Sequence, residues 1–247
     1  PPRSTLFPYT TLFRSDRAAI RILDIPAGAG KLTTVLREQG FSVTASDINR
    51  AQDDYVYSDM TKRLPFADGS YDVVICLEGI EHIPNPVDLI NELSRITKPG
   101  GTVILSTPNI SSMYSRFTFL FTGFFFMFRP EEGYVNTKRE TEHDYWHISP
   151  MTWNKILFHF AENGFDLSGL YGNKMKRKLL LPFYLLALLI GYPWQKLGFR
   201  KYRNSGKHLA LQTGYYTQVR EYAQSYPALF SRNIVLAMKK KEKSATP

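Results

Sequence analysis

The sequence predicts an α/β fold, built on a doubly wound and mostly parallel sheet with helices on both faces. Three observations predict it. Short apolar runs alternate along the chain with segments of helical periodicity. Gly28 and Gly30 form a turn between the first such pair. The run at 73–75 is apolar throughout, which is typical of a strand covered on both faces.

The expected elements follow in order along the chain. Strands are expected at 21–25, 41–46, 54–57, 71–76 and 102–107, and helices at 31–39 and 86–97. The second helix begins at Pro86, because proline suits the first helical turn, and stops at the Lys-Pro-Gly-Gly sequence of 98–101. A third helix is expected within 149–164, and a strand follows at 165–171.

The glycine turn indicates a site for a nucleoside-bearing cofactor. Gly28 and Gly30 keep side chains away from the backbone, and the start of the next helix offers free N–H groups. Asp47 closes the second strand, where a carboxylate can accept both hydroxyls of a ribose. We therefore expect the turn and Asp47 to hold one ligand between them.

Two cofactors compete for this turn. A dinucleotide site has the pattern Gly-x-Gly-x-x-Gly, and Thr33 occupies its third glycine position, so an NAD(P)-dependent oxidoreductase is the alternative. The segment also resembles the first motif of class I S-adenosylmethionine-dependent methyltransferases, with Asp24, Gly28 and Gly30 in register. It departs from that motif at Pro26, where the family has glycine.

Later blocks resemble the same family in the same order, including its branch of ubiquinone-biosynthesis O-methyltransferases. The blocks are 59–60, 64–76, 78–86, 98–101 and 102–109. The resemblance covers residue 21 to about residue 167, with a last strand at 233–239. It implies a seven-stranded sheet closed by an antiparallel hairpin. It also implies methyl transfer from S-adenosylmethionine to a small or lipid-linked acceptor, with oxygen expected ahead of carbon or nitrogen.

The resemblance assigns cofactor contacts by position. Asp24, Ala27, Gly28 and Gly30 would face the methionine part, and Asp47 would hold the ribose. The remaining contacts would be made by Asp59 to the adenine amino group, Met60 to the ring, and Cys76 and Leu77 along the cofactor wall.

Glu78, Glu81 and His82 are the catalytic candidates. They follow the fourth strand at the carboxyl edge of the sheet, where ligands bind, and an oxygen acceptor needs a base or a metal to remove its proton. In the quinone branch the matching positions are associated with Mg²⁺. We interpret His82 instead as a brace for its loop, and keep magnesium as the alternative. The acceptor pocket is expected to include His143, Tyr145 and His147.

The chain is expected to hold one domain over residues 16–247. Residues 1–15 resemble the translation of a sequencing adapter and are set aside as an artefact. The domain carries two insertions, an acceptor cover at 109–148 and an apolar, basic helical segment at 172–232.

The apolar runs at 117–128 and 179–192 lie in these insertions. Neither reaches the roughly 20 apolar residues that cross a bilayer. Basic flanks and Trp194 suit a segment that lies in a membrane surface, although the runs could instead cap the acceptor pocket. A non-catalytic membrane-surface protein is therefore a further alternative.

The formal net charge is +9, and the chain contains a single cysteine, Cys76. No nucleic-acid-binding module accompanies the charge, so a nucleic-acid partner is not expected. One cysteine allows no internal disulfide and fits a reducing compartment. We therefore expect a cytoplasmic protein, peripheral on the inner face of the membrane if its insertions bind lipid.

Overall fold

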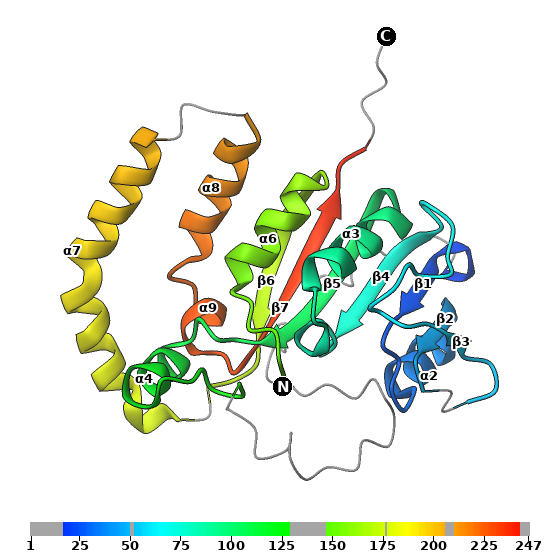
Figure 1. The fold of residues 1–247 in the computed structure, drawn as a ribbon, viewed down its shortest axis with the longest axis horizontal. Helices are drawn as coiled ribbons and strands as arrows, with labels where there is room; N and C mark the ends of the chain where they lie inside the picture. Colours follow the sequence, from blue (N-terminus) through cyan, green and yellow to red (C-terminus); the bar gives the residue numbers. More distant parts are fainter. Residues whose placement is uncertain (1–16, 50–51, 129–146, 176, 206–209, 243–247) are drawn as a thin grey trace.

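The computed structural model describes residues 17–49, 52–128, 147–175, 177–205 and 210–242. Its centre is a seven-stranded sheet in the order β3-β2-β1-β4-β5-β7-β6 (Figure 1). The strands are β1 Arg21–Asp24, β2 Ser42–Asp47, β3 Val56–Tyr57, β4 Tyr71–Leu77, β5 Thr97–Pro108, β6 Phe165–Gly172 and β7 Asn233–Lys240. β7 pairs antiparallel with both β5 and β6, and the other neighbouring strands of this sheet pair in parallel. The predicted fold class and the closing hairpin are confirmed.

The helices fall into two groups. Those that cover the sheet are α2 Lys31–Glu38, α3 Pro86–Ile96 and α6 Trp153–Glu162. Those in the insertions are α4 Met113–Thr122, α7 Leu181–Ser205, α8 Ala210–Tyr222 and α9 Tyr226–Phe230. Short 3₁₀ turns occupy η1 Arg17–Ala19, η2 Ile80–His82 and η3 Lys178–Leu180. In Figure 1, α7 and α8 stand beyond the β6 edge of the sheet.

The apolar run in β4 is buried on both faces of the sheet. Val74 packs into the larger core cluster with Leu93 of α3 and Phe160 of α6. Val73 points the other way, into the cluster that contains Leu36 of α2. Successive side chains of a strand face opposite sides, so the middle of a strand between two helical layers is apolar on both faces.

Two predicted strand starts differ from the structure by two residues or more. The strand expected at 102–107 begins five residues earlier, at Thr97, because a register shift opposite Tyr71 lets the ladder continue through the glycines. At Gly101 a Cβ would lie 2.8 Å from the carbonyl oxygen of Lys98, so only glycine fits there. The strand expected at 54–57 contains only Val56–Tyr57.

The insertions are anchored to the sheet at the end of β5. The Asn109 amide nitrogen donates to the carbonyl oxygens of Ala228 and Ser231, each at 3.1 Å. A separate apolar cluster, including Met113, Tyr184 and Leu229, joins α4, α7 and α9. No helix among the described residues combines the length and hydropathy that crossing a bilayer would require. The set-aside segment 1–15 lies outside the described residues.

Candidate functional site

The turn after β1 is tied directly to the end of β2. Gly28 and Gly30 adopt φ values of 52° and 74°, in the region that favours glycine. The Gly28 N–H donates to one carboxylate oxygen of Asp47 at 2.8 Å, and the Asn49 N–H donates to the other at 2.8 Å. A Cβ on Gly30 would collide with the hydroxyl of Tyr55. Sequence reasoning placed Asp47 near this turn, and the hydrogen bond shows that they meet.

Thr33 has a role that the dinucleotide pattern did not predict. Its hydroxyl donates to a carboxylate oxygen of Asp24 at 2.6 Å, and both side chains are buried. Burial raises the pKa of Asp24, and the hydrogen bonds from Thr33 oppose that rise. Thr33 therefore satisfies a buried carboxyl group that a glycine would leave without this donor.

Asp59 and Met60 lie beyond the short strand β3. Asp59 is buried and accepts hydrogen bonds from the N–H of Thr61 at 2.9 Å and its hydroxyl at 2.7 Å. Burial alone would raise the pKa of Asp59, but these bonds and the charge of Lys62 outweigh it and lower the pKa. Met60 is half-buried, and its methyl group lies beside Gly79 after β4.

The other predicted cofactor contacts differ in exposure. Ala27 and Leu77 are half-buried at the carboxyl ends of β1 and β4. Cys76 is fully enclosed in the larger core cluster, and this burial raises the pKa of its thiol. Its side chain has no exposed surface, so the structure places it in the core rather than along an open wall.

Glu78 uses its carboxylate in hydrogen bonds to other strands. Its backbone has φ 50°, and its carboxylate accepts from the Ser106 hydroxyl at 2.6 Å and from the Asn233 amide at 2.5 Å. The side chain thus links the ends of β4, β5 and β7. Sequence reasoning did not identify Ser106 or Asn233, although both lie where strands end at the ligand-binding edge.

Glu81, His82 and His147 form the cluster that the structure does bring together. One ligand atom from each lies within 4.8 Å of the others. The ring centroids of His82 and His147 are 4.8 Å apart, in an edge-to-face arrangement. Nδ1 of His147 lies 3.0 Å from the carbonyl oxygen of Met127. Burial lowers the pKa of His147, and the neighbouring His82 adds to the effect.

Glu81 is the acid of this cluster, and its pKa is strongly shifted. It has no exposed surface, one carboxylate oxygen accepts from the Thr107 hydroxyl at 3.1 Å, and the other has no partner among the described residues. Burial, followed by the charge of Glu78, raises the pKa of Glu81 to about 8. A carboxyl group in this state exchanges its proton near neutral pH.

The magnesium alternative does not fit this arrangement. It required Glu78, Glu81 and His82 together, and Glu78 is held by Ser106 and Asn233 instead. The residue that joins the other two is His147. Two imidazoles and one carboxylate are a poor donor set for Mg²⁺, which prefers oxygen ligands. His143 and Tyr145 lie outside the described residues.

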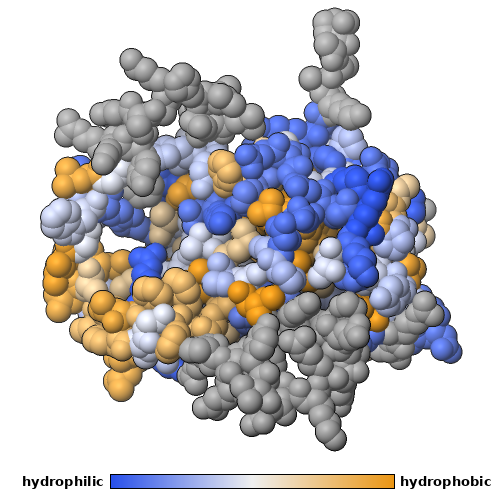
Figure 2. Space-filling model, in the orientation of Figure 1, coloured by the Kyte–Doolittle hydropathy of each residue, from blue (hydrophilic) through white to orange (hydrophobic). Residues whose placement is uncertain are grey.

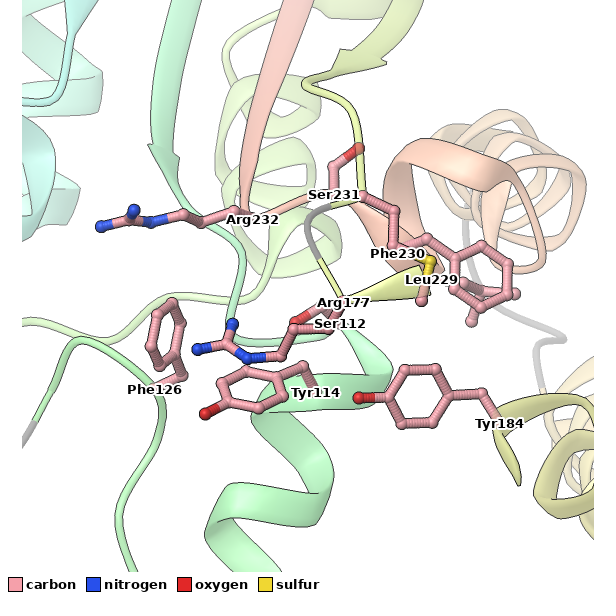
Figure 3. A pocket seen from close by; sticks show the side chains of 10 residues that line it. Ser112, Tyr114, Phe126, Arg177, Tyr184, Leu229, Phe230, Ser231 and Arg232 are labelled. Carbon is pink, nitrogen blue, oxygen red and sulfur yellow. The ribbon is translucent and has the colours of Figure 1, made fainter. Parts of the chain in front are cut away.

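A second pocket lies at the start of α4 and was not anticipated from the sequence. Figure 3 shows Arg177 and Arg232 on either side of Phe126, with Tyr114 and Tyr184 completing the walls. The Nε of Arg232 lies 3.4 Å from the sulfur of Met127, whose carbonyl oxygen contacts His147. Met127 therefore contacts both a residue that lines the pocket and a member of the histidine pair.

Comparison with known proteins identifies the family. A family model described as a methyltransferase domain matches residues 4–165. The chain belongs to the class I S-adenosylmethionine-dependent methyltransferases. This membership selects the methyltransferase interpretation of the glycine turn over the dinucleotide alternative, and confirms the resemblance found in the motif blocks.

Curated relatives of this methyltransferase include ubiquinone biosynthesis O-methyltransferases. The protein from Pseudomonas aeruginosa is 35% identical over 113 residues, covering 39% of this chain and 47% of the relative. That from Xanthomonas oryzae pv. oryzae is 34% identical over 110 residues, covering 39% and 46%. The chain thus spans about half the length of the curated relatives it matches.

Solved structures agree on the fold. A SAM-dependent methyltransferase from Archaeoglobus fulgidus has a TM-score of 0.54 at 16% identity, covering 94% of this chain and 90% of that one. A SAM-dependent methyltransferase from Methanosarcina mazei has a TM-score of 0.52 at 18% identity, covering 96% and 99%. At these identities the similarity concerns the architecture alone.

Proposed function

We propose that this chain transfers the methyl group of S-adenosylmethionine to an oxygen atom of a small or lipid-linked acceptor. The observation that supports it most directly is the bond between the Gly28 N–H and the Asp47 carboxylate, at 2.8 Å. This bond places the carboxylate beside the open turn, and each oxygen keeps a lone pair for a ribose hydroxyl. The family membership supplies the identity of the cofactor.

Calorimetric titration with S-adenosylmethionine tests the cofactor site. Asp47→Ala removes the ribose acceptor and the tie to the turn, and we expect it to weaken binding by at least tenfold, since charge-assisted hydrogen bonds contribute about 1.5–3 kcal/mol each. Asp53→Ala is the matched control, because Asp53 is exposed and lies outside the turn. Equal affinity in the two variants would refute the role of Asp47.

Methyl transfer to oxygen is an in-line displacement in which the acceptor oxygen bonds to the methyl carbon and the carbon–sulfur bond breaks. The acceptor must lose its proton. From the sequence alone we interpret His82 as a loop brace. Because the structure brings it next to His147 and Glu81, we propose His82, which is half-buried, as the base, with Glu81 acting through it as a positioning residue. Glu78 holds the loop after β4 to β5 and β7.

The base assignment has a test in product formation. Labelled methyl transfer into a membrane extract, followed by mass spectrometry of the product, identifies the acceptor and the methylated atom. We expect His82→Gln to lower kcat about 100-fold or more with little change in S-adenosylmethionine affinity. A product methylated on carbon, or an unchanged kcat, would contradict the proposal.

We also propose that this protein is cytoplasmic and works at a membrane surface. Large apolar side chains are exposed along α4, η3 and α7, including Phe121 at 77%, Leu179 at 93%, Leu189 at 71% and Trp194 at 75%. Figure 2 shows the apolar surface gathered over α4 and α7. Residues 172–220 contain no Asp or Glu, so the apolar surface lies within a basic segment. An anionic bilayer complements both properties.

Vesicle flotation tests this surface. Burying an exposed side chain of this size contributes about 1–2 kcal/mol, so Phe121→Asp with Leu189→Asp should weaken binding to phosphatidylglycerol vesicles at least tenfold. Val35→Asp is the control, since Val35 is 48% exposed but lies on α2. Equal binding by both variants would contradict the proposal, as would a protein that avoids vesicles and instead dimerises through these helices.

A further inference from the structure

The pocket at the start of α4 holds two positive charges that no carboxylate neutralises in the described part of the chain. The guanidinium carbon of Arg177 lies 3.7 Å from the ring centre of Tyr114 and 5.5 Å from that of Phe126. The guanidinium carbon of Arg232 lies 5.6 Å from the same Phe126 ring. Aromatic faces therefore hold both cations in place while their N–H groups remain available to an anion.

Tyr184 contributes a buried hydroxyl without a partner. Its side chain is only 2% exposed, and its oxygen makes no hydrogen bond with the described residues. In Figure 3 this hydroxyl points toward Tyr114, across the pocket from α7. A buried unsatisfied hydroxyl is costly, so a ligand oxygen that accepted its proton would be favoured.

The N-terminus of α4 adds a third favourable element. Ser112 lines the pocket as the N-cap residue, and its hydroxyl accepts from the Ser115 N–H at 3.2 Å. The first turn of any α-helix also leaves N–H groups without an intrahelical partner, at the positive end of the helix dipole. Two arginines, a buried hydroxyl and a helix N-terminus together favour a phosphate-type anion.

An apolar groove adjoins the pocket. It encloses about 600 Å³ between α4 and α7, its walls include Phe117, Leu120 and Leu188, and it shares Leu229 with the pocket. The pocket itself has a volume of about 30 Å³, which is room for about two oxygen atoms of an anionic group. The two spaces together match an amphiphile whose phosphate and hydrocarbon chain are adjacent.

We propose that the pocket of Arg177, Arg232 and Tyr184 binds the phosphate of an amphiphilic acceptor whose hydrocarbon chain lies in the groove between α4 and α7. The inference rests on the proposed methyltransferase function and names the class of acceptor. Met127 contacts both Arg232 and His147, so the pocket and the histidine pair are neighbours, and the reacting end of a bound acceptor would have to pass Met127 to reach His82.

Calorimetry on the full chain, saturated with S-adenosylmethionine, tests the pocket. The probes are dihexanoyl phosphatidic acid below its micelle concentration, inorganic phosphate, and octyl glucoside as a neutral amphiphile. We expect phosphatidic acid to bind at least tenfold more tightly than either of the others, because only it has both features. Arg177→Gln should weaken its binding about tenfold or more, and Tyr184→Phe about threefold to tenfold.

The matched control is Lys178→Gln. It removes the same charge from the next residue, which does not line the pocket, and should leave phosphatidic acid affinity unchanged. An equal loss in Lys178→Gln would reduce the effect to overall charge and overturn the proposal. Equal affinity for inorganic phosphate would indicate a site for free phosphate. Equal affinity for octyl glucoside would indicate that only the apolar groove binds. Either result would overturn the proposal.

The proposed function and this inference fail separately. Each variant is also titrated with S-adenosylmethionine, whose affinity should not change, and its thermal unfolding shows whether it folds. If the unmodified chain does not bind S-adenosylmethionine, the methyltransferase function is refuted. Unchanged phosphatidic acid affinity in folded Arg177→Gln and Arg232→Gln variants would refute the anion pocket.

Discussion

The buried carboxyl group of Glu81 should make the stability of this protein fall as the pH rises through neutrality. Its pKa is raised from 4.5 to about 8 in the folded chain. Between these values the folded state keeps a proton that the unfolded state has released. Unfolding therefore releases a proton throughout this window, and rising pH favours unfolding.

The size of the effect follows from the window. One proton difference changes the free energy of unfolding by about 1.4 kcal/mol per pH unit. From pH 5.5 to 7.5 the unfolded group is almost fully ionised and the folded group mostly protonated, so we expect a loss of about 2 kcal/mol from Glu81. The contribution is fully present below about pH 4.5 and ends above about pH 8.

Urea unfolding at pH 5.5, 6.5 and 7.5 measures this slope. Glu81→Gln keeps an oxygen for the Thr107 hydroxyl but cannot ionise, so the slope should flatten by about 1 kcal/mol per pH unit. Glu38→Gln, at the exposed end of α2, is the control and should retain the full slope. The same pH dependence in unmodified chain and Glu81→Gln would refute the reasoning.

Three further predictions test how the sheet and its turn are built. Thr33→Val should cost about 1–3 kcal/mol in urea unfolding, because it removes the 2.6 Å donor to the buried carboxyl group after β1. Gly30→Ala should lower the free energy of unfolding more than Gly40→Ala, because both glycines have positive φ but only a Cβ at position 30 meets a side chain. In titrations with S-adenosylmethionine, only Gly30→Ala should bind more weakly. Phe160→Ala should lower the free energy of unfolding by about 3–5 kcal/mol, and Phe158→Ala by much less, because the Phe160 ring is fully buried and the Phe158 side chain is 38% exposed. Equal shifts of the two variants in thermal unfolding would contradict this prediction.

The central sheet could be predicted from the sequence because its signals are local. The apolar run at 73–75 and the glycine turn depend on residues within a few positions of one another, and both predictions are confirmed. The start of β5 at Thr97 could not be predicted, since it depends on a register shift against Tyr71 in the neighbouring strand.

The candidate site could be predicted only in part. Asp47 and the turn were paired correctly because the carboxyl ends of adjacent parallel strands meet at one edge. The partners of Glu78 were missed, because Asn233 lies 155 residues further along the chain. The local spacing of Glu78, Glu81 and His82 suggested one cluster, but the Glu78 carboxylate bonds to Ser106 and Asn233, and the third member of the cluster is His147.

By itself, the sequence determined the alternation of strands and helices, the open turn at Gly28 and the family to which the chain belongs, because each depends on residues that are close together in the sequence. Only the tertiary structure decided that His147 joins His82 and that Arg177 and Arg232 share one aromatic ring. Such pairs depend on how the insertions pack against the ends of the strands. That packing is the sum of many weak apolar contacts between distant segments, and no short pattern specifies it.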